Sequence, residues 1–337
     1  MNVHVLLPGL TAPSWRFGGR LIAETFTGLL NRHVPARVVT YRDREEGTPF
    51  LDDLLPAAGP ADLFVATWGP HVQGLLERLA GRRVVYYAQS TGWDLQLPEG
   101  VPVLCLSRHI LAFWMLRAPH NPLFLLGPVL GAGCADLGLE RDIDVLFLER
   151  KSTAYLKEVL VPALQPRWNV HVVRDFLPRG ELIRLYNRSK VYLYSSAPTA
   201  SGWVEGFGFQ PLEALVCGCT VFSNLHGGLA DYLDPEVNAF KLETHSLAYD
   251  LERIGAALRG GFRPEGVAEL LRTYSEEAFH ERVRRFLPVL EAFFAGAGAA
   301  PPDIGRLTLA AVPADRSWLR RALRLGSFNR RAARRNP

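Results

Sequence analysis

Two glutamates bracket a short loop of glycine and aromatic residues in the second half of the chain. The segment 205–213 reads Glu-Gly-Phe-Gly-Phe-Gln-Pro-Leu-Glu, and a short apolar run then leads to Gly218. Pro211 suits the first position of a helix, because the N–H that proline lacks would have no partner there. We therefore expect a helix over 211–217. It places Glu213 in the first turn, where the helix dipole favours an anion, and Gly218 in a left-handed cap.

This loop combines groups that bind phosphate with groups that bind hydroxyls. Gly206 and Gly208 let the backbone approach a ligand closely, and a helix N-terminus with free N–H groups attracts phosphate. The carboxylates of Glu205 and Glu213 can accept hydrogen bonds from hydroxyls, so the expected ligand is a nucleotide sugar. The spacing alone is weak evidence, because 34 of the 337 residues are acidic. The alternative is a solvated loop carboxylate beside an ordinary helical glutamate.

The flanking sequence alternates apolar strands with amphipathic segments in both halves of the chain. Such alternation predicts an α/β fold with parallel sheets covered on both faces, and ligands bind beyond the carboxyl ends of the strands in such sheets. The expected strands are 3–7, 36–40, 62–67, 83–88, 101–106 and 122–126 in the first half, and 144–148, 170–173, 191–194 and 220–223 in the second. The expected helices are 18–31, 72–79, 108–116, 154–164, 180–187, 211–217, 227–232, 247–258, 266–274 and 276–294.

The loop and its surroundings resemble the retaining glycosyltransferases of the GT-B fold, specifically glycosyltransferase family 4 (glycosyl transferases group 1). The matching residues are Glu205-Gly206-Phe207-Gly208, Glu213-Ala214, Gly218 and Gly227-Gly228. The resemblance implies two Rossmann-like, doubly wound domains that face each other across a cleft. It divides the chain into an acceptor-side domain over 1–128, a linker over 129–142, a nucleotide-sugar-binding domain over 143–294, whose last helix can cross back to the first domain, and a linker with a basic tail over 295–337.

The resemblance also implies roles for individual residues on the donor side. Glu213 would hold the ribose diol and Glu205 the sugar hydroxyls, while the backbone at Phe207, Gly208 and Phe209 approaches the donor. The glycine pair Gly18-Gly19 would lie beneath the donor diphosphate. Without the resemblance, such a pair is more often a simple tight turn.

The diphosphate leaving group needs positive charge, which enzymes of this fold usually supply without a metal. Glu149, Arg150 and Lys151 directly follow the strand at 144–148. We expect Arg150 and Lys151 to neutralise the diphosphate. The family commonly has Gly-Arg here and a lysine about five residues later. Glu149 stands in place of that glycine, so Lys157 is the alternative to Lys151. We expect no bound metal or other cofactor.

The acceptor side is less clearly marked. Many family members carry a histidine at the end of the strand that corresponds to 62–67. Thr67 takes that position here, so the candidates for the sugar contact are Thr67, Trp68 and His71. A lone histidine is more often structural. The polar strand end at 87–91 is expected to line the same side.

Retention of anomeric configuration in this fold is attributed to front-face attack, in which a leaving phosphate oxygen accepts the proton of the acceptor. No dedicated side-chain base is therefore required. Two other functions remain open at this point: a nucleotide-sugar epimerase on the same fold, and a sugar-nucleotide or glycan-binding protein without activity. No G-x-G-x-x-G follows the first strand, which argues against an NAD enzyme.

The charge of the chain is unevenly distributed. Eight arginines and no acid lie in 316–337, so the preceding residues carry a net charge of −4 within a total of +4. Leu319, Ala322 and Leu323 share one helical face there, which favours an interfacial helix on an anionic membrane; a solvated tail is the alternative, and nucleic acid is not expected. The acceptor would be a glycan or a lipid-linked glycan. The four scattered cysteines are expected to be buried thiols of a cytoplasmic protein, peripheral at the inner face of the plasma membrane.

Overall fold

A computed structural model describes most of the chain as far as Gly296. The described residues are 1–15, 18–67, 69–91, 95–131, 133–150, 152–196, 204–242, 244, 246–260, 262 and 264–296. One compact unit covers Met1–Leu290, and a second unit begins at Glu291. Of the second unit the structure describes only residues 291–296, the end of one helix.

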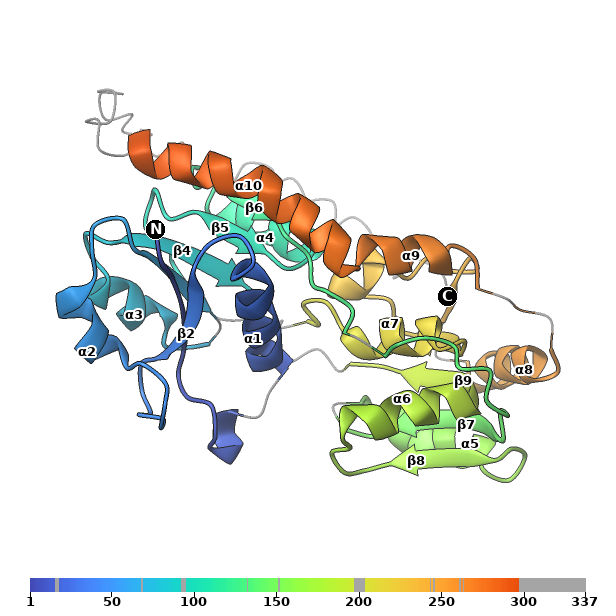
Figure 1. Cartoon of the computed structure of the whole chain (residues 1–337). Coiled ribbons are helices and arrows are strands. Elements are labelled where there is room, and N and C mark those ends of the chain that lie inside the picture. Colours follow the sequence, from blue (N-terminus) through green and yellow to red (C-terminus); the bar gives the residue numbers. More distant parts are fainter. Residues whose placement is uncertain are drawn as a thin grey trace, which may run out of the picture. The chain divides into compact units, whose positions relative to one another are not determined.

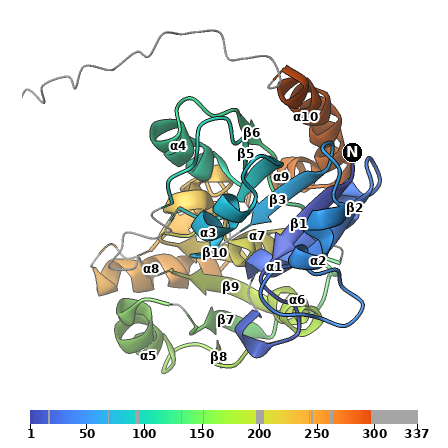
Figure 2. The same ribbon diagram turned by 90° about the vertical axis from the view of Figure 1, so that its left-hand side faces the viewer.

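Residues of the first half form a six-stranded sheet in which every pair of neighbouring strands is parallel. Its order is β2-β1-β3-β4-β5-β6, and Figure 2 shows β1, β2 and β3 side by side. Val3 at the start of β1 pairs with Ala36 of β2 on one side and Leu63 of β3 on the other. The strands are β1 (Val3–Leu7), β2 (Ala36–Thr40), β3 (Leu63–Thr67), β4 (Arg83–Ala88), β5 (Val103–Cys105) and β6 (Leu123–Leu125).

Helices between these strands bury the apolar residues of the sheet. Helix α1 packs against β1 and β2, α3 against β3, and α4 against β5 and β6. All five residues of β1 and of β3 are buried, as expected for strands covered on both faces. The helices are α1 (Gly18–Leu30), α2 (Leu51–Leu54), α3 (Val72–Arg78) and α4 (Arg108–Arg117) (Figure 1).

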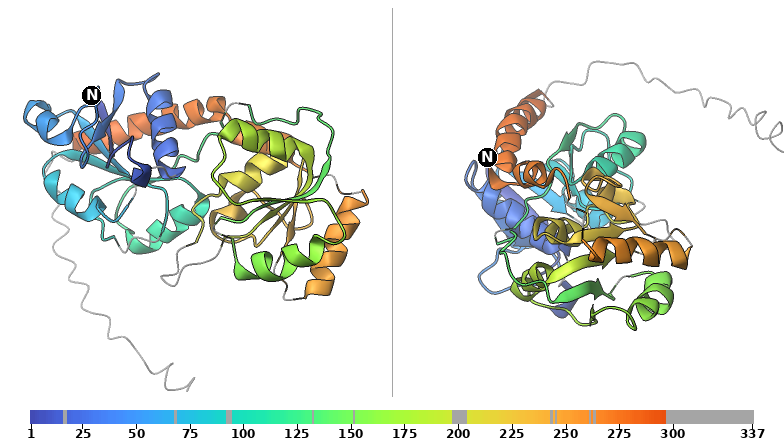
Figure 3. Two further views of the ribbon diagram at one scale, coloured as in Figure 1. Left: turned by 90° about the horizontal axis from the view of Figure 1, so that it is seen from below. Right: turned by 90° about the vertical axis from the view of Figure 1, so that its right-hand side faces the viewer.

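Residues of the second half form a five-stranded parallel sheet in the order β11-β10-β9-β7-β8. Figure 3 shows α6 and α7 on one face and α5 and α8 on the other. Val145 and Phe147 of β7 pack with Ile254 of α8 in one buried cluster. The strands are β7 (Ile143–Leu148), β8 (Val170–Val173), β9 (Ser189–Tyr194), β10 (Thr220–Ser223) and β11 (Ala239–Lys241); the helices are α5 (Val161–Leu164), α6 (Arg179–Arg188), α7 (Phe209–Val216), α8 (Leu247–Leu258), α9 (Val267–Thr273) and α10 (Glu276–Gly296).

Both sheets have the strand order 2-1-3-4-5 of a doubly wound α/β fold, with a sixth strand added to the first sheet. In each sheet the chain reverses its direction of winding next to the first strand, between β1 and β3 and between β7 and β9. Ligands of open parallel sheets bind at this reversal, beyond the carboxyl ends of the strands. In the second sheet it is therefore the residues after Leu148 and Tyr194 that are placed to meet a ligand.

Helix α10 returns to the first sheet within the first compact unit. Phe279 contacts Phe26 of α1, with ring centroids 6.2 Å apart, and Phe286 lies 5.9 Å from Phe124 of β6. His280 Nδ1 lies 2.8 Å from His33 Nε2, just beyond α1. These contacts attach the start of the last helix to elements from the first half of the chain.

The predicted parallel α/β architecture is confirmed, with strand bounds within two residues of those expected. The sequence did not indicate α2 or β11, and the segment expected as one helix over 154–164 is a π-helix, Tyr155–Leu160, followed by α5. One expectation was wrong in a way that matters for the site. Helix α7 begins at Phe209, so Pro211 is its third residue and Glu213 lies beyond its first turn.

Candidate active site

Two glycine-containing loops pack backbone to backbone at the carboxyl edge of the second sheet. The N–H of Gly228 donates to the carbonyl oxygen of Glu205 over 2.8 Å. A Cβ atom on Gly228 would collide with the carbonyl of Gly206, and one on Gly227, which has φ +63°, would collide with that of Glu205. The Gly227-Gly228 turn after β10 therefore has to lack side chains, because it supports the loop that carries Glu205.

Gly206 makes a second close approach, to the end of β4 in the first sheet. A Cβ atom at Gly206 would collide with the carbonyl oxygen of Gln89. We expected this glycine to admit a ligand, but in the structure the neighbour that requires it is protein backbone. The loop between Glu205 and Gly208 is thus supported from two sides.

Gly208 starts helix α7 with a left-handed backbone, φ +79°, and no side chain among the described residues caps the helix. The first N–H groups of a helix lack intrahelical partners, so the start of α7 presents donors. The Tyr232 hydroxyl donates to the Gly208 carbonyl and fixes the turn. The ring of Phe207 is buried between Tyr232 and Tyr274. Only its backbone can meet a ligand.

Glu213 is buried and paired with an arginine. Its side chain is 8% exposed, and Arg179 Nη2 donates to Oε1 over 2.9 Å. Burial raises the pKa of the Glu213 carboxyl, and the charge of Arg179 opposes that shift. The pair keeps a carboxylate at the inner end of the loop while leaving the arginine side chain 45% exposed.

Arg179, the first residue of α6, is the functional candidate that the sequence analysis missed. It lies 34 positions from Glu213, and no local pattern links the two. A signal was present in principle, since a buried carboxylate needs a cationic partner. Its guanidinium also occupies the space where Gly131 would carry a Cβ atom, and lies 3.2 Å from the Cys134 sulfur.

The cysteines are structural in the way we expected. All four are free and buried. The Cys219 thiol donates to the carbonyl of Tyr186 over 3.0 Å. In the part of the chain that the structure describes, no group of three or more His, Cys, Asp or Glu side chains is placed to hold a metal ion.

Glu205 has a different environment from Glu213. It is half-buried, and the hydroxyl of Tyr194, the last residue of β9, donates to its Oε2 over 3.1 Å. Burial raises the pKa of Tyr194, with a further contribution from the Glu205 charge, so the phenol stays protonated and remains a donor. Tyr194 holds one carboxylate oxygen of Glu205 and leaves acceptor capacity on the other.

Several buried polar atoms at the carboxyl edges of the two sheets have no hydrogen-bond partner among the described residues. They belong to side chains at the end of β4, at the start of α4 and after β10: the amide of Gln89, Ser90 Oγ, His109 Nε2, Asn224 Oδ1 and His226 Nδ1. Buried polar groups are nearly always paired. Unpaired atoms gathered around the carboxyl ends of strands therefore indicate a place where a ligand or ordered water supplies the missing partners.

The start of α4 is held by an acid from the 3-10 helix Gly227–Asp231, which follows β10. Asp231 accepts hydrogen bonds from the backbone N–H groups of Arg108, at 2.6 Å, and His109, at 3.3 Å. Burial lowers the pKa of His109; Asp231 opposes this and the nearby His226 reinforces it. His109 is thus kept neutral, and its Nε2 is buried without a hydrogen-bond partner in the described part of the chain.

Arg150 lies where the strand order of the second sheet reverses. It follows β7 by two residues, is exposed, and has its guanidinium 6.0 Å from the ring of Phe176. Glu149, which departs from the family pattern, forms an ion pair with Arg174 over 3.1 Å. Lys151 lies outside the described residues. Lys157 is exposed on the π-helix, so the choice between the two lysines stays a prediction.

The remaining candidates come from the first sheet. Gly18 and Gly19 are the first residues of α1, and a Cβ atom on Gly18 would meet no described residue within 4 Å. The Thr67 hydroxyl is buried and donates to the carbonyl of Leu6 over 2.8 Å, so it is already satisfied. His71 is half-buried and contacts Arg42. Trp68 lies outside the described residues.

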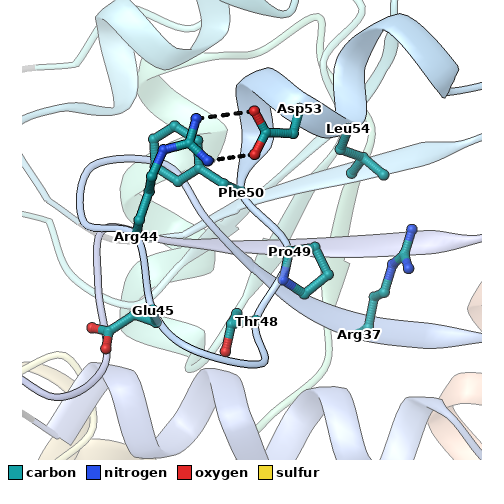
Figure 4. Close-up of a pocket in the computed structure, with 8 residues that line it drawn as sticks. All are labelled: Arg37, Arg44, Glu45, Thr48, Pro49, Phe50, Asp53 and Leu54. Carbon is teal, nitrogen blue, oxygen red and sulfur yellow. Dashed lines mark hydrogen bonds and ion pairs between the residues drawn. The ribbon is translucent and has the colours of Figure 1, made fainter.

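A pocket of about 310 Å³ over β2 contains none of these predicted site residues (Figure 4). Its acid Asp53 is paired with Arg44, whose guanidinium also lies 4.2 Å from the centre of the Phe50 ring. The charged groups that line this pocket are largely committed to each other. We therefore place the candidate site at Glu205–Glu213.

Residues 154–258 match the protein-family model described as glycosyl transferases group 1. No curated protein matches the chain in sequence. Solved structures with a similar fold include a sucrose-phosphate synthase from Thermosynechococcus elongatus (13% identity, TM-score 0.58, 86% of this chain and 99% of that one). Another is AviGT4, a glycosyltransferase involved in avilamycin A biosynthesis (14% identity, TM-score 0.57, 88% of this chain and 98% of that one). A third is HepE from Anabaena in complex with UDP and glucose (16% identity, TM-score 0.55, 86% of this chain and 99% of that one).

Proposed function

We propose that this chain, which has the GT-B fold, is a glycosyltransferase that takes its sugar from a nucleotide-sugar donor and retains the anomeric configuration. The observation that carries the proposal is the loop from Glu205 to Glu213. It places two carboxylates of different exposure on either side of a helix start with free N–H groups, at the carboxyl edge of a doubly wound sheet. The family match over 154–258 contains this loop. A similar fold binds UDP and glucose in HepE.

The two glutamates have separate tasks in this proposal. Glu213 accepts hydrogen bonds from the ribose diol of the donor, and the charge of Arg179 opposes the rise in its pKa that burial causes. Glu205, oriented by Tyr194, accepts hydrogen bonds from hydroxyls of the transferred sugar. Backbone N–H groups at the start of α7 donate to the donor.

The leaving diphosphate is stabilised by cationic side chains. Arg150 is exposed beyond β7, beside the reversal of strand order, and can reach a phosphate group held there. Lys151 or Lys157 supplies a second charge. Because the charge of the leaving group grows in the transition state, these contacts accelerate the reaction more than they tighten binding. In this account no metal ion takes part, and a phosphate oxygen accepts the proton of the attacking hydroxyl.

The acceptor is a glycan or a lipid-linked glycan, and the basic segment 316–337 attaches the enzyme to an anionic membrane surface. That segment lies outside the described residues. What supports this part of the proposal is its composition: eight arginines interspersed with Trp318, Leu319, Leu323 and Phe328. No described helix is long and apolar enough to cross a membrane.

A thermal-shift screen across nucleotide sugars tests the donor site. At least one nucleoside diphosphate and its sugar should raise the melting temperature of the wild-type chain. Glu213→Ala should weaken that ligand about 10- to 100-fold, because a hydrogen bond to a charged group contributes about 1.5–3 kcal/mol. Unchanged affinity in a folded Glu213→Ala variant would refute the assignment.

A further inference from the structure

A second pocket, of about 410 Å³, lies at the carboxyl ends of β2 and β3 in the first sheet. β1 lies between these strands, so the pocket adjoins the reversal of strand order, where parallel sheets bind ligands. Its walls come from the residues after β2 and from the start of α3. They are Tyr41, Arg42, Pro70, His71, Gly74, Leu75 and Arg78.

The positive charge of Arg42 is not balanced by any carboxylate among the described residues. Within the described residues no carboxylate forms an ion pair with its guanidinium, which contacts His71 Nε2 and lies 5.7 Å over the ring of Trp15. The acids closest in sequence are engaged elsewhere. Asp43 accepts a hydrogen bond from the Trp15 indole, and Glu45 accepts hydrogen bonds from the loop after β1. The charge of Arg42 is therefore open to an external anion.

His71 is neutral in this arrangement. Burial lowers the pKa of its imidazole, and the charge of Arg42 lowers it further. A guanidinium can only donate, so Nε2 of His71 accepts from Arg42 and the ring carries its proton on Nδ1. His71 thus has one remaining hydrogen-bonding group, and that group is a donor.

Tyr41 supplies a buried hydroxyl without a partner. The residue is 5% exposed, and its oxygen has no hydrogen-bond partner in the described part of the chain. Burial raises the pKa of Tyr41 to about 12, while Arg42 and Arg78 act to lower it, so both guanidinium charges are felt at this oxygen. The phenol is protonated at neutral pH and is a donor. An unpaired buried hydroxyl is costly, and an acceptor atom in the pocket would remove that cost.

The polar groups of the pocket are therefore donors with one uncompensated positive charge. Arg78 adds a second cation, balanced by Asp52 at 2.5 Å on the exposed side. We infer that this pocket binds an anionic group, a carboxylate or a phosphate, carried by the acceptor sugar. That the anionic group belongs to the acceptor rests on the proposed glycosyltransferase function. That the pocket binds an anion does not.

The position of the pocket fits an extended acceptor. β2 and β4 are three strand spacings apart in the sheet, which is about 14 Å. Gln89 follows β4 and touches the Gly206 loop. An acceptor whose anionic group lies beside Arg42 would extend along the carboxyl edge of the sheet toward the donor loop. The substrate class is thus a sugar acid or a sugar phosphate rather than a neutral sugar.

Calorimetric titration of the full chain tests this inference with three probes: glucuronate, glucose 1-phosphate and the neutral methyl glucoside. At least one anion should bind more tightly than the neutral sugar, and the stronger of the two identifies carboxylate or phosphate as the natural group. Arg42→Gln should weaken the anion about tenfold or more and leave the glucoside unchanged. Arg44→Gln is the matched control: it removes an arginine from the same loop that is already paired with Asp53 (Figure 4). No preference for either anion over the glucoside, or equal anion affinity in Arg42→Gln and wild type, overturns the inference.

Two further measurements separate this site from a structural role and from the donor site. Tyr41→Phe should weaken the anion several-fold while the melting temperature stays the same or rises, because the variant removes an unpaired buried hydroxyl. A lower melting temperature without loss of anion affinity would give Tyr41 a structural role instead and would contradict its place in the site. UDP affinity should be the same in wild type and Arg42→Gln. A chain that binds the anions but no nucleoside diphosphate would sink the glycosyltransferase proposal and leave the anion site standing.

Discussion

Glu205 and Glu213 show how the same residue type is suited to two tasks by its surroundings. Glu213 is buried and balanced by Arg179, whereas Glu205 is half-buried and held by the neutral phenol of Tyr194. The first arrangement gives a fixed carboxylate for a ligand that arrives in one orientation. The second leaves the carboxylate partly hydrated and able to exchange water for sugar hydroxyls.

The raised pKa of Glu213 predicts a pH-dependent effect of Glu213→Gln on stability. A carboxyl whose pKa is higher in the folded state contributes stability that is fully present below the unfolded pKa and is lost as the pH rises through the folded pKa. Glutamine does not titrate, so the Glu213→Gln variant does not lose this stability as the pH rises. The melting temperature of Glu213→Gln minus that of wild type should therefore increase from about pH 4 to about pH 7.

Both chains are measured in the same buffers, so the contributions of other titrating groups to the difference in melting temperature largely cancel. A difference that falls over this pH range would mean that pairing with Arg179 outweighs burial. The pKa of Glu213 would then be lowered rather than raised.

Arg150 is expected to act on turnover more than on binding. Arg150→Ala should lower kcat by about tenfold or more while nucleoside affinity changes little, because the leaving diphosphate gains charge in the transition state. Arg174→Ala is the matched control, since Arg174 is exposed and paired with Glu149 after the neighbouring strand. Steady-state kinetics that show the same loss in both variants would remove Arg150 from the site.

At the scale of elements, the loop 205–208 packs against the Gly227-Gly228 turn and against Gln89. This packing explains why glycines are required there better than the close approach of a ligand does. Gly206 and Gly228 are required by neighbouring carbonyl groups, and the donors at the start of α7 are positioned as a consequence. The site depends on two loops from the second sheet and on the end of β4.

Gly206→Ala should destabilise the chain by about 1–3 kcal/mol, the usual cost of forcing extra volume into a packed position, and should also weaken donor binding. Gly28→Ala is the control: it lies exposed within α1, and its Cβ atom would meet nothing within 4 Å. That variant should be more stable by about 0.5–1 kcal/mol. Chemical denaturation measures the stability of both variants. A Gly206→Ala chain as stable as wild type would disprove that backbone packing around the loop 205–208 requires this glycine.

The helices and strands show which features of the site can be predicted from a sequence. Apolar runs and turn residues located the strands, and the motif located Glu205, Glu213 and Gly218. The start of α7 was placed two residues late because Gly208, which lies against Leu229 and Tyr232, begins the helix with a positive φ ahead of Pro211. Arg179 could not be found, since its partner is distant in the sequence and only the fold brings them together.

The pocket at Arg42 illustrates the same limit. His71 was considered because of its place after β3, but nothing local identified Tyr41 or Arg42. Their importance comes from what the neighbouring acids do: Asp43 and Glu45 are engaged by other groups. Whether a charge is compensated is a property of the folded chain.

At the scale of the whole molecule, the uneven charge predicts how the chain meets a membrane. A chain that ends at Asp315 should keep its fold and its nucleotide affinity, but should lose sedimentation with anionic liposomes. Each arginine near an anionic surface contributes about 1 kcal/mol, and salt should weaken the attraction by screening. Equal liposome binding by the full-length and shortened chains at low salt would contradict membrane attachment through 316–337.

The central claim is that the loop from Glu205 to Glu213 supports transfer from a nucleotide sugar. The most direct measurement is the release of nucleoside diphosphate from a panel of labelled nucleotide sugars, with EDTA present, by wild type and by Glu213→Ala. The account predicts that wild type releases nucleoside diphosphate from at least one donor, slowly to water and faster when a glycan acceptor is added, and that Glu213→Ala reduces the release about tenfold or more at limiting donor. Release that requires magnesium or manganese would contradict the metal-free mechanism. Equal release by the Glu213→Ala variant, or none from any donor by wild type, would contradict the function itself.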